Sequence, residues 1–288
     1  QVARHGVAHH AQAEKGHAVG GAGVVGFGGN GAHGLGLAWM RVEQGVEFSS
    51  LLQVFGTLGD MTRIAQQLQT VHDRIRQACA AAGRPEASVR LLAVSKTFGP
   101  EAVREAHAAG QTAFGENYIQ EAVDKIQALQ DLPLEWHCIG PIQSNKTRLV
   151  AEHFAWVHSV DRLKIAQRLS EQRPPHLPPL QVCLQVNTDG GPTKSGVAPE
   201  DVVALARAVG ALPRLVLRGL MTIPDPVVGF EAEVALHRRA TTLFERVQAE
   251  LALPQFDTLS MGMTADLEAA IAAGSTMVRV GTAIFGQR

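Results

Sequence analysis

The stretch Leu259–Gly286, LSMGMTADLEAAIAAGSTMVRVGTAIFG, indicates the fold that we expect for this chain. A short apolar run gives way to a helical pattern over Thr264–Ala273, and a second apolar run follows at Met277–Val280. Gly274 stands just after the helical pattern, where helices favour a residue that adopts positive φ. The segment EAHAAGQTAFG, at 105–115, has the same order of helix, Ala-Ala-Gly and strand. Recurring units of this kind predict strands that alternate with helices.

The same alternation extends over most of the chain. The predicted strands are Arg90–Ser95, Thr112–Gly115, Glu135–Ile139, Ala155–Ser159, Leu180–Asn187, Val216–Met221, Thr258–Met261 and Met277–Val280. The predicted helices between them are Pro100–Ala109, Asn117–Leu129, Ser144–His153, Arg162–Gln172, Pro199–Val209, Phe230–Leu251 and Thr264–Ala273. Eight strands that alternate with helices predict an α/β protein with a single (β/α)8 TIM-type barrel. An open doubly wound sheet is the alternative that the pattern leaves open.

Composition excludes several classes of protein. The 288 residues are 45% hydrophobic, and 26 basic residues nearly balance 27 acidic ones, without a basic run that would favour nucleic acid. No apolar stretch reaches the roughly 18 residues that span a bilayer, so we expect no membrane segment. Cys79, Cys138 and Cys183 lack CxxC spacing, which argues against a disulfide framework and a zinc site. We therefore expect a cytoplasmic protein without a metal site.

The first 60 residues differ from the rest, because they hold 14 of the 29 glycines and show no sustained period. GAGVVG, at Gly21–Gly26, matches GxGxxG, but a dinucleotide site needs a strand before it and a helix after it, and neither flank supplies one. We predict that residues 1–60 form a low-complexity, disordered extension, which an over-extended gene start would explain. The domain is predicted to span 61–288, and its first helix carries the apolar stripe Ile64, Leu68, Val71, Ile75 and Cys79.

The last two predicted strands end in turns that suit a phosphate group. Ser260 and Gly262 precede a helix whose N-cap we expect at Thr264, and Gly281 and Thr282 precede a short final turn. Helix N-termini present unpaired N–H groups, and glycine lets a phosphate approach the backbone. In barrels of this kind the loops after strands 7 and 8 often bind phosphate. Tight turns that need small residues are the structural alternative.

Lys96 ends the apolar run LLAVSKT, at 91–97, and is predicted to lie at the carboxyl ends of the strands. An amine must lose its proton to attack an aldehyde, and burial or a nearby cation favours that loss. Lys146 and Lys194 are candidate neighbours, although solvated loop lysines would look the same. A reactive lysine and a phosphate site at one barrel mouth indicate pyridoxal 5′-phosphate (PLP), bound as a Schiff base.

Four further residues need an explanation in the expected barrel. Arg279 alternates with two valines, so it is predicted to face the interior, where it needs a carboxylate or a ligand as acceptor. His137 and Cys138 are adjacent in a strand and point to opposite faces, which argues against a catalytic pair. Asp161 is predicted to be the N-cap of the next helix.

The sequence resembles the pyridoxal phosphate homeostasis protein family, from about Met61 to Arg288. The motifs that carry the resemblance are LLAVSKTFGPE, FGENYIQEA, WHCIGPIQSNK, HSVDR, VNTDGGPTKSG, GLMTIP and the whole 259–286 block. The resemblance implies a barrel like the N-terminal domain of alanine racemase, the fold-type III arrangement for PLP. It further implies Schiff-base formation by Lys96, phosphate binding by Ser260, Gly281 and Thr282, and contact of Arg279 with the pyridine nitrogen. Lys194 and Asn117 are then expected near the cofactor.

Two functions of different class follow from this resemblance. The first is a non-enzymatic protein that carries or buffers PLP in vitamin B6 and amino-acid homeostasis, with PLP-requiring apo-enzymes as recipients. The second is an amino-acid racemase, which needs a second acid/base on the other face of the cofactor. In the racemases that residue is a tyrosine from a second domain, whereas the single tyrosine here is Tyr118. We therefore expect the carrier, as a monomer that binds neither nucleic acid nor membrane.

Overall fold

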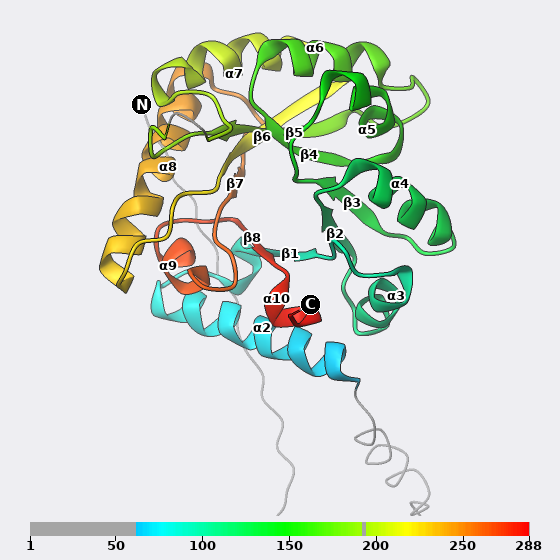
Figure 1. Cartoon of the computed structure of the whole chain (residues 1–288). Helices are drawn as coiled ribbons and strands as arrows, with labels where there is room; N and C mark the ends of the chain where they lie inside the picture. The colour runs from blue at the N-terminus through cyan, green and yellow to red at the C-terminus, as the bar shows by residue number, and fades with distance from the viewer. Residues whose placement is uncertain (1–61, 192–193, 288) are drawn as a thin grey trace, which may run out of the picture. The chain divides into compact units, whose positions relative to one another are not determined.

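The computed structural model of this protein describes residues 62–191 and 194–287 (Figure 1). Eight parallel strands form a closed barrel in sequence order. They are β1 (Arg90–Val94), β2 (Ala113–Glu116), β3 (Glu135–Cys138), β4 (Trp156–Val160), β5 (Leu180–Val186), β6 (Leu215–Thr222), β7 (Thr258–Ser260) and β8 (Met277–Val280). The predicted barrel is confirmed. The predicted extension, residues 1–60, lies outside the described residues.

Pairing of the first and last strands distinguishes the barrel from the open sheet. β1 and β8 run in parallel, with Leu91 opposite Val278 and Ala93 opposite Val280. Because β8 also pairs with β7, neither strand is left as an edge. The doubly wound alternative is therefore wrong, and the carboxyl ends of all eight strands meet at one mouth.

Helices cover the outside of the barrel, as Figure 1 shows. They are α2 (Arg63–Ala81), α3 (Pro100–Ala108), α4 (Ile119–Ala128), α5 (Thr147–His153), α6 (Leu163–Gln172), α7 (Val202–Gly210), α8 (Phe230–Leu251), α9 (Leu267–Ala272) and α10 (Thr282–Phe285), with short 3₁₀ turns η1 (Glu86–Ser88), η2 (Ser144–Lys146) and η3 (Pro199–Asp201). α10 is short, and α2 packs against both α9 and α10. The first helix of the domain thus covers the barrel beside its last strand.

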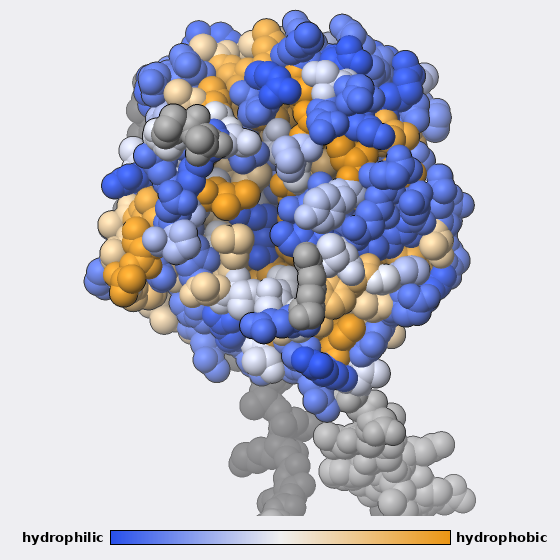
Figure 2. Space-filling view, viewed as in Figure 1, coloured by the Kyte–Doolittle hydropathy of each residue, from blue (hydrophilic) through white to orange (hydrophobic). Residues whose placement is uncertain are grey.

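Side-chain alternation along the strands separates two regions of the core. Leu91 and Ala93 belong to the large apolar cluster that strands share with helices, whereas Leu92 lies in a separate cluster with Ala113 and Met277. A third cluster contains Trp156, Cys183 and Met221. Since successive strand residues point to opposite faces, we assign the two small clusters to the barrel interior. On the face seen in Figure 2, hydrophilic residues predominate and hydrophobic ones show as separate patches.

Two predicted helix caps are wrong. α9 begins at Leu267, and the residue at its N-cap is Asp266, whose carboxylate accepts a hydrogen bond from the backbone N–H of Met263. Thr264 therefore lies in a turn before the cap. At α6 the cap position is occupied by Arg162, and the carboxylate of Asp161 instead binds the guanidinium of Arg162. In both cases the helix begins later than its polar residue suggests, and the side chain at the cap position makes no capping hydrogen bond to the helix.

None of the helices in the part of the chain that the structure describes combines the length and apolarity needed to cross a membrane. Within residues 62–191 and 194–287, no three His, Cys, Asp or Glu side chains are grouped so that they could hold a metal ion.

Candidate functional site

A cavity of about 380 Å³ opens at the mouth of the barrel between the ends of β1 and β8. Its lining residues are Val94, Lys96, Phe98, Gly281, Thr282, Gly286 and Gln287. Lys96 is two residues beyond β1, and Gly281 and Thr282 directly follow β8, so the pairing of these two strands brings them together. The structure thus joins three of the predicted site residues in one cavity.

Gly281 allows the two strand ends to approach closely. A Cβ atom at this position would lie 3.0 Å from the carbonyl oxygen of Val94 and 3.3 Å from its Cβ. The carbonyl of Gly281 accepts hydrogen bonds from the N–H groups of Ile284 and Phe285, which form the turn of α10. The first N–H groups of this turn have no partner within the helix. They are the donors that an anionic group in the cavity would meet.

The backbone on either side of Lys96 is held by side chains from β2 and α4. Ser95 is fully buried, its hydroxyl donates to Glu116 over 2.6 Å, and its carbonyl accepts from Lys125 over 2.9 Å. The N–H of Thr97 donates to Glu121 over 2.6 Å. Thr97 has a φ of 67°, which is unusual for a residue with a branched side chain. These bonds hold Lys96 in a sharp turn with its side chain at the cavity.

Sequence reasoning missed the buried ion pair that supports this turn. The ammonium of Lys125 lies 2.6 Å from Glu116, and the two side chains are only 3% and 0% exposed. Burial raises the pKa of Glu116, and the adjacent Lys125 opposes that rise. Glu116 and Lys125 are nine positions apart, and α4 begins between them. The pair becomes visible only when α4 packs against β1 and β2, although Glu121 and Lys125 have the helical i,i+4 spacing that indicates a pair.

Arg279 faces the barrel interior, as predicted, and is 4% exposed. Its acceptors are neutral oxygens rather than a carboxylate: Nη1 donates to the carbonyl and the hydroxyl of Ser260, and Nη2 donates to the carbonyl of Thr222. Burial lowers the pKa of Arg279 to about 10. The hydroxyl of Thr222 is buried and has no partner among the described residues. The residue whose carbonyl binds the guanidinium therefore also carries a buried hydroxyl that a ligand could satisfy.

Ser260 is fully buried, and its hydroxyl is already engaged on two sides. It lies 2.8 Å from Nη1 of Arg279 and 3.0 Å from Nδ1 of His158. His158 in turn contacts His137, which contacts Glu135. Cys138 points the other way and contacts the carbonyl of Gly140, and burial raises its pKa to about 12. His137 and Cys138 are thus both buried on opposite faces and do not form a pair.

The remaining predicted residues lie around the mouth but outside this cavity. Asn117 directly follows β2 and is partly buried. Its backbone packs so tightly against Gly140 that a Cβ atom on Gly140 would lie 2.1 Å from the carbonyl oxygen of Asn117. Lys194 follows β5 and binds two carboxylates, Asp189 at 2.5 Å and Asp225 at 2.8 Å. Although burial opposes it, these carboxylates raise the pKa of Lys194. A role for Asn117 or Lys194 at a cofactor stays a prediction.

Comparison with known proteins identifies the family. The model of the alanine racemase N-terminal domain family matches residues 66–288. A pyridoxal phosphate homeostasis protein of Pseudomonas aeruginosa is 62% identical over 228 residues, which cover 79% of this chain and 97% of that protein. This chain belongs to the pyridoxal phosphate homeostasis protein family. The family member of the same name from Escherichia coli is 52% identical over 231 residues and is covered over 98% of its length.

Solved structures agree with this family and with the barrel. PipY of Synechococcus elongatus, determined with PLP bound, is 39% identical with a TM-score of 0.67, and the match covers 77% of this chain and 100% of that chain. Alanine racemase of Corynebacterium glutamicum is 18% identical with a TM-score of 0.55 and is covered over 60% of its length, so it shares the fold. The family that the sequence resembles is therefore confirmed.

Proposed function

We propose that this protein binds PLP as a Schiff base on Lys96 and carries or buffers it without catalytic turnover. The observation that carries the proposal is the cavity that joins Lys96 with Gly281 and Thr282. An amine for the aldehyde and glycine-flanked N–H groups for the phosphate are the two features that PLP requires of a site. When bound, PLP supplies an aldehyde and an electron-withdrawing ring.

Different residues of this chain are proposed to bind different parts of PLP. Lys96 supplies the attaching amine, and its position depends on Ser95, Glu116 and Lys125. Gly281 and Thr282 are proposed to hold the phosphate, through backbone N–H groups and a hydroxyl. Arg279 is proposed to face the pyridine nitrogen. Because the hydroxyl of Ser260 already contacts Arg279 and His158, we propose that its side chain supports Arg279 more than it binds phosphate.

The comparisons support a carrier more than a racemase. The match covers 97% of the Pseudomonas aeruginosa protein but 60% of alanine racemase, so the family members are about one barrel long. Tyr118, the single tyrosine, has 55% of its surface exposed. A guanidinium at the pyridine nitrogen is also a poor proton donor, which makes the ring a weak sink for a carbanion.

Cys79, Cys138 and Cys183 are all free and buried, which supports a location in the reducing cytoplasm. PLP-requiring apo-enzymes are the recipients that we propose.

The test is a spectrum of the purified protein and borohydride reduction. A visible absorption band and a trapped PLP adduct on Lys96 are expected. Lys96→Ala should lose both, whereas Lys146→Ala, which alters another partly buried lysine at the mouth, should keep both. A normal adduct in Lys96→Ala would refute the assignment. Chiral chromatography of amino acids after incubation separates the functions, because sustained conversion of L to D would identify a racemase.

A further inference from the structure

A chain of hydrogen bonds crosses the barrel interior from one end of the strands to the other. Oε1 of Glu135 lies 2.8 Å from Nε2 of His137, and Nδ1 of His137 lies 2.9 Å from Nε2 of His158. Nδ1 of His158 lies 3.0 Å from the hydroxyl of Ser260, which lies 2.8 Å from Nη1 of Arg279. Glu135 begins β3, whereas Ser260 ends β7. The chain therefore links the amino-terminal face of the barrel with the mouth.

The two groups at the ends of this hydrogen-bond chain, Glu135 and Arg279, each have a fixed role as acceptor or donor. An ionised carboxylate can only accept a hydrogen bond, and a guanidinium can only donate one. The pKa of Glu135 is raised by burial, but hydrogen bonds from His137 and Arg90 outweigh that effect and lower it to about 2. Glu135 is thus an acceptor, and Arg279 is a donor, at any pH near neutrality.

Burial favours the neutral form of both imidazoles between these ends. His137 and His158 are both fully buried, and burial lowers the pKa of each. The charged groups that face them are Glu135, which favours a proton on His137, and Arg90 and Arg279, which disfavour a further positive charge. The ring of His137 also stacks on Trp156 with an angle of 8° between the planes. In this neutral form each imidazole carries one hydrogen, on one of its two nitrogens.

One hydrogen on each ring leaves a single consistent arrangement. His137 must donate from Nε2 to Glu135, so its Nδ1 accepts. His158 must then donate from Nε2 to His137, and its Nδ1 accepts from Ser260. We propose that Glu135 acts through His137 and His158 as a positioning unit that makes the Ser260 hydroxyl donate into the barrel and not toward the mouth. Ser260 accepts from Arg279 in the same arrangement, so its oxygen stabilises the guanidinium.

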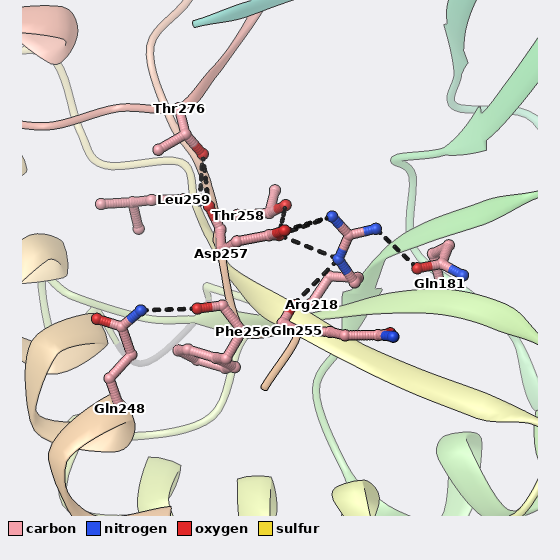
Figure 3. Close-up of polar contacts among 9 residues, drawn as sticks. All are labelled: Gln181, Arg218, Gln248, Gln255, Phe256, Asp257, Thr258, Leu259 and Thr276. Carbon is pink, nitrogen blue, oxygen red and sulfur yellow. Dashed lines mark hydrogen bonds and ion pairs between the residues drawn. The ribbon is translucent and has the colours of Figure 1, made fainter. Parts of the chain in front are cut away.

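Removal of the acceptor at Glu135 should reverse the donor-to-acceptor direction of the hydrogen bonds between Glu135 and Ser260. Glu135 lines a cavity of about 540 Å³ at the amino-terminal face, where it also accepts from Arg90 over 2.8 Å. Arg218, in the same cavity, is held by Asp257 and Gln181 (Figure 3) and is not available as a replacement donor. Arg90, released from Glu135, would then donate to Nε2 of His137. Both rings would carry their hydrogen on Nδ1, and His158 would donate to Ser260.

Such a reversal frees the Ser260 hydroxyl to donate elsewhere, without any change in the net number of protons. Any effect of this reversal on PLP binding rests on the proposed function, but the direction of the hydrogen bonds does not. It is a property of the protein alone and can be measured on the full chain before any cofactor is added.

The experiment is nitrogen-15 NMR of the imidazoles in the full chain at a pH near 7.5. In the native sequence His137 and His158 should both be neutral and protonated on Nε2. Glu135→Gln should keep this pattern, because the amide oxygen still accepts, whereas Glu135→Leu should move both hydrogens to Nδ1. Glu152→Leu is the matched control: Glu152 lines the same cavity, and its side chain is 36% exposed against 35% for Glu135. It should leave both tautomers unchanged.

Several results would overturn the proposal. An imidazolium, or a hydrogen on Nδ1 of either ring, in the native sequence would contradict the arrangement outright. Unchanged tautomers in a folded Glu135→Leu would remove Glu135 as the group that sets the direction. Ser260→Ala gives an independent check at the other end, since His158 should keep its hydrogen on Nε2. A shift to Nδ1 in that variant would mean that the mouth, and not Glu135, sets the direction.

Discussion

Glu116 and Lys125 form an ion pair of 2.6 Å whose side chains are almost entirely removed from solvent. Lys125 also donates to the carbonyl of Ser95, and Glu116 accepts from the Ser95 hydroxyl. Both charged side chains therefore also form a hydrogen bond with Ser95, the residue that precedes Lys96. A buried pair of this kind is costly to break from one side, because the remaining charge is left without a partner.

Lys125→Met should destabilise the protein by about 3–5 kcal/mol, the range for loss of one partner from a buried pair. It should also reduce the yield of the borohydride-trapped adduct on Lys96, because the turn at Ser95 loses a support. Urea denaturation and mass spectrometry of the reduced protein measure the two effects. Lys164→Met, at an exposed position of α6, is the control and should stay within about 0.5 kcal/mol of the native sequence. Equal losses in the two variants would contradict the role of the pair.

Acid should destabilise the barrel through its buried histidines. Burial lowers the pKa of His137 and of His158 below the usual 6.5, so the unfolded chain binds protons that the native protein does not. The free energy of unfolding therefore keeps its full value above about pH 6.5 and decreases as the pH falls below it. Urea denaturation at a series of pH values should show this decline, and His158→Gln should show a shallower one. His176→Gln removes an exposed histidine and should keep the native slope. Parallel curves for all three proteins would contradict the prediction.

Gly281→Ala should weaken PLP binding about tenfold, or about 1.4 kcal/mol. The added Cβ would press on Val94 at 3.0 Å and move the end of β8 away from β1, which widens the cavity that contains Lys96. Titration of the apo-protein with PLP, followed by absorbance, gives the dissociation constant. Gly210→Ala is the matched control, because its Cβ would meet Leu253 at an ordinary 3.5 Å. An unchanged dissociation constant in Gly281→Ala would argue against phosphate binding at this turn.

Tyr118→Phe should leave both the absorption band and the chirality of incubated amino acids unchanged. The side chain is 55% exposed at the start of α4, and a carrier has no need of a second acid/base. Absorbance spectra and chiral chromatography, compared with the native protein, measure the outcome. Any slow conversion of L to D by the native protein that disappears in Tyr118→Phe would mean that the tyrosine acts as an acid/base.

The alternation of strands and helices could be predicted from the sequence, because β/α alternation and glycine caps are local patterns, whereas closure of the barrel depends on the pairing of β1 with β8. The sequence also determined which strand ends carry Lys96, Gly281 and Thr282, since parallel strands place all their carboxyl ends at one mouth. The inward direction of Arg279 followed from alternation with its valine neighbours. The predicted caps at Thr264 and Asp161 were wrong because a helix boundary shifts easily by one or two residues and a polar side chain alone does not fix it.

The partners of the buried charges depend on how the strands and helices pack together. Glu116 meets Lys125 only when α4 packs on the strands, and Glu135, His137, His158, Ser260 and Arg279 come from four strands, β3, β4, β7 and β8. Closure of the barrel brings these strands around one interior, which no local pattern encodes. Inside it, water is excluded and each polar group must find a partner in the protein. That requirement is what fixes the hydrogen-bonded chain behind the mouth.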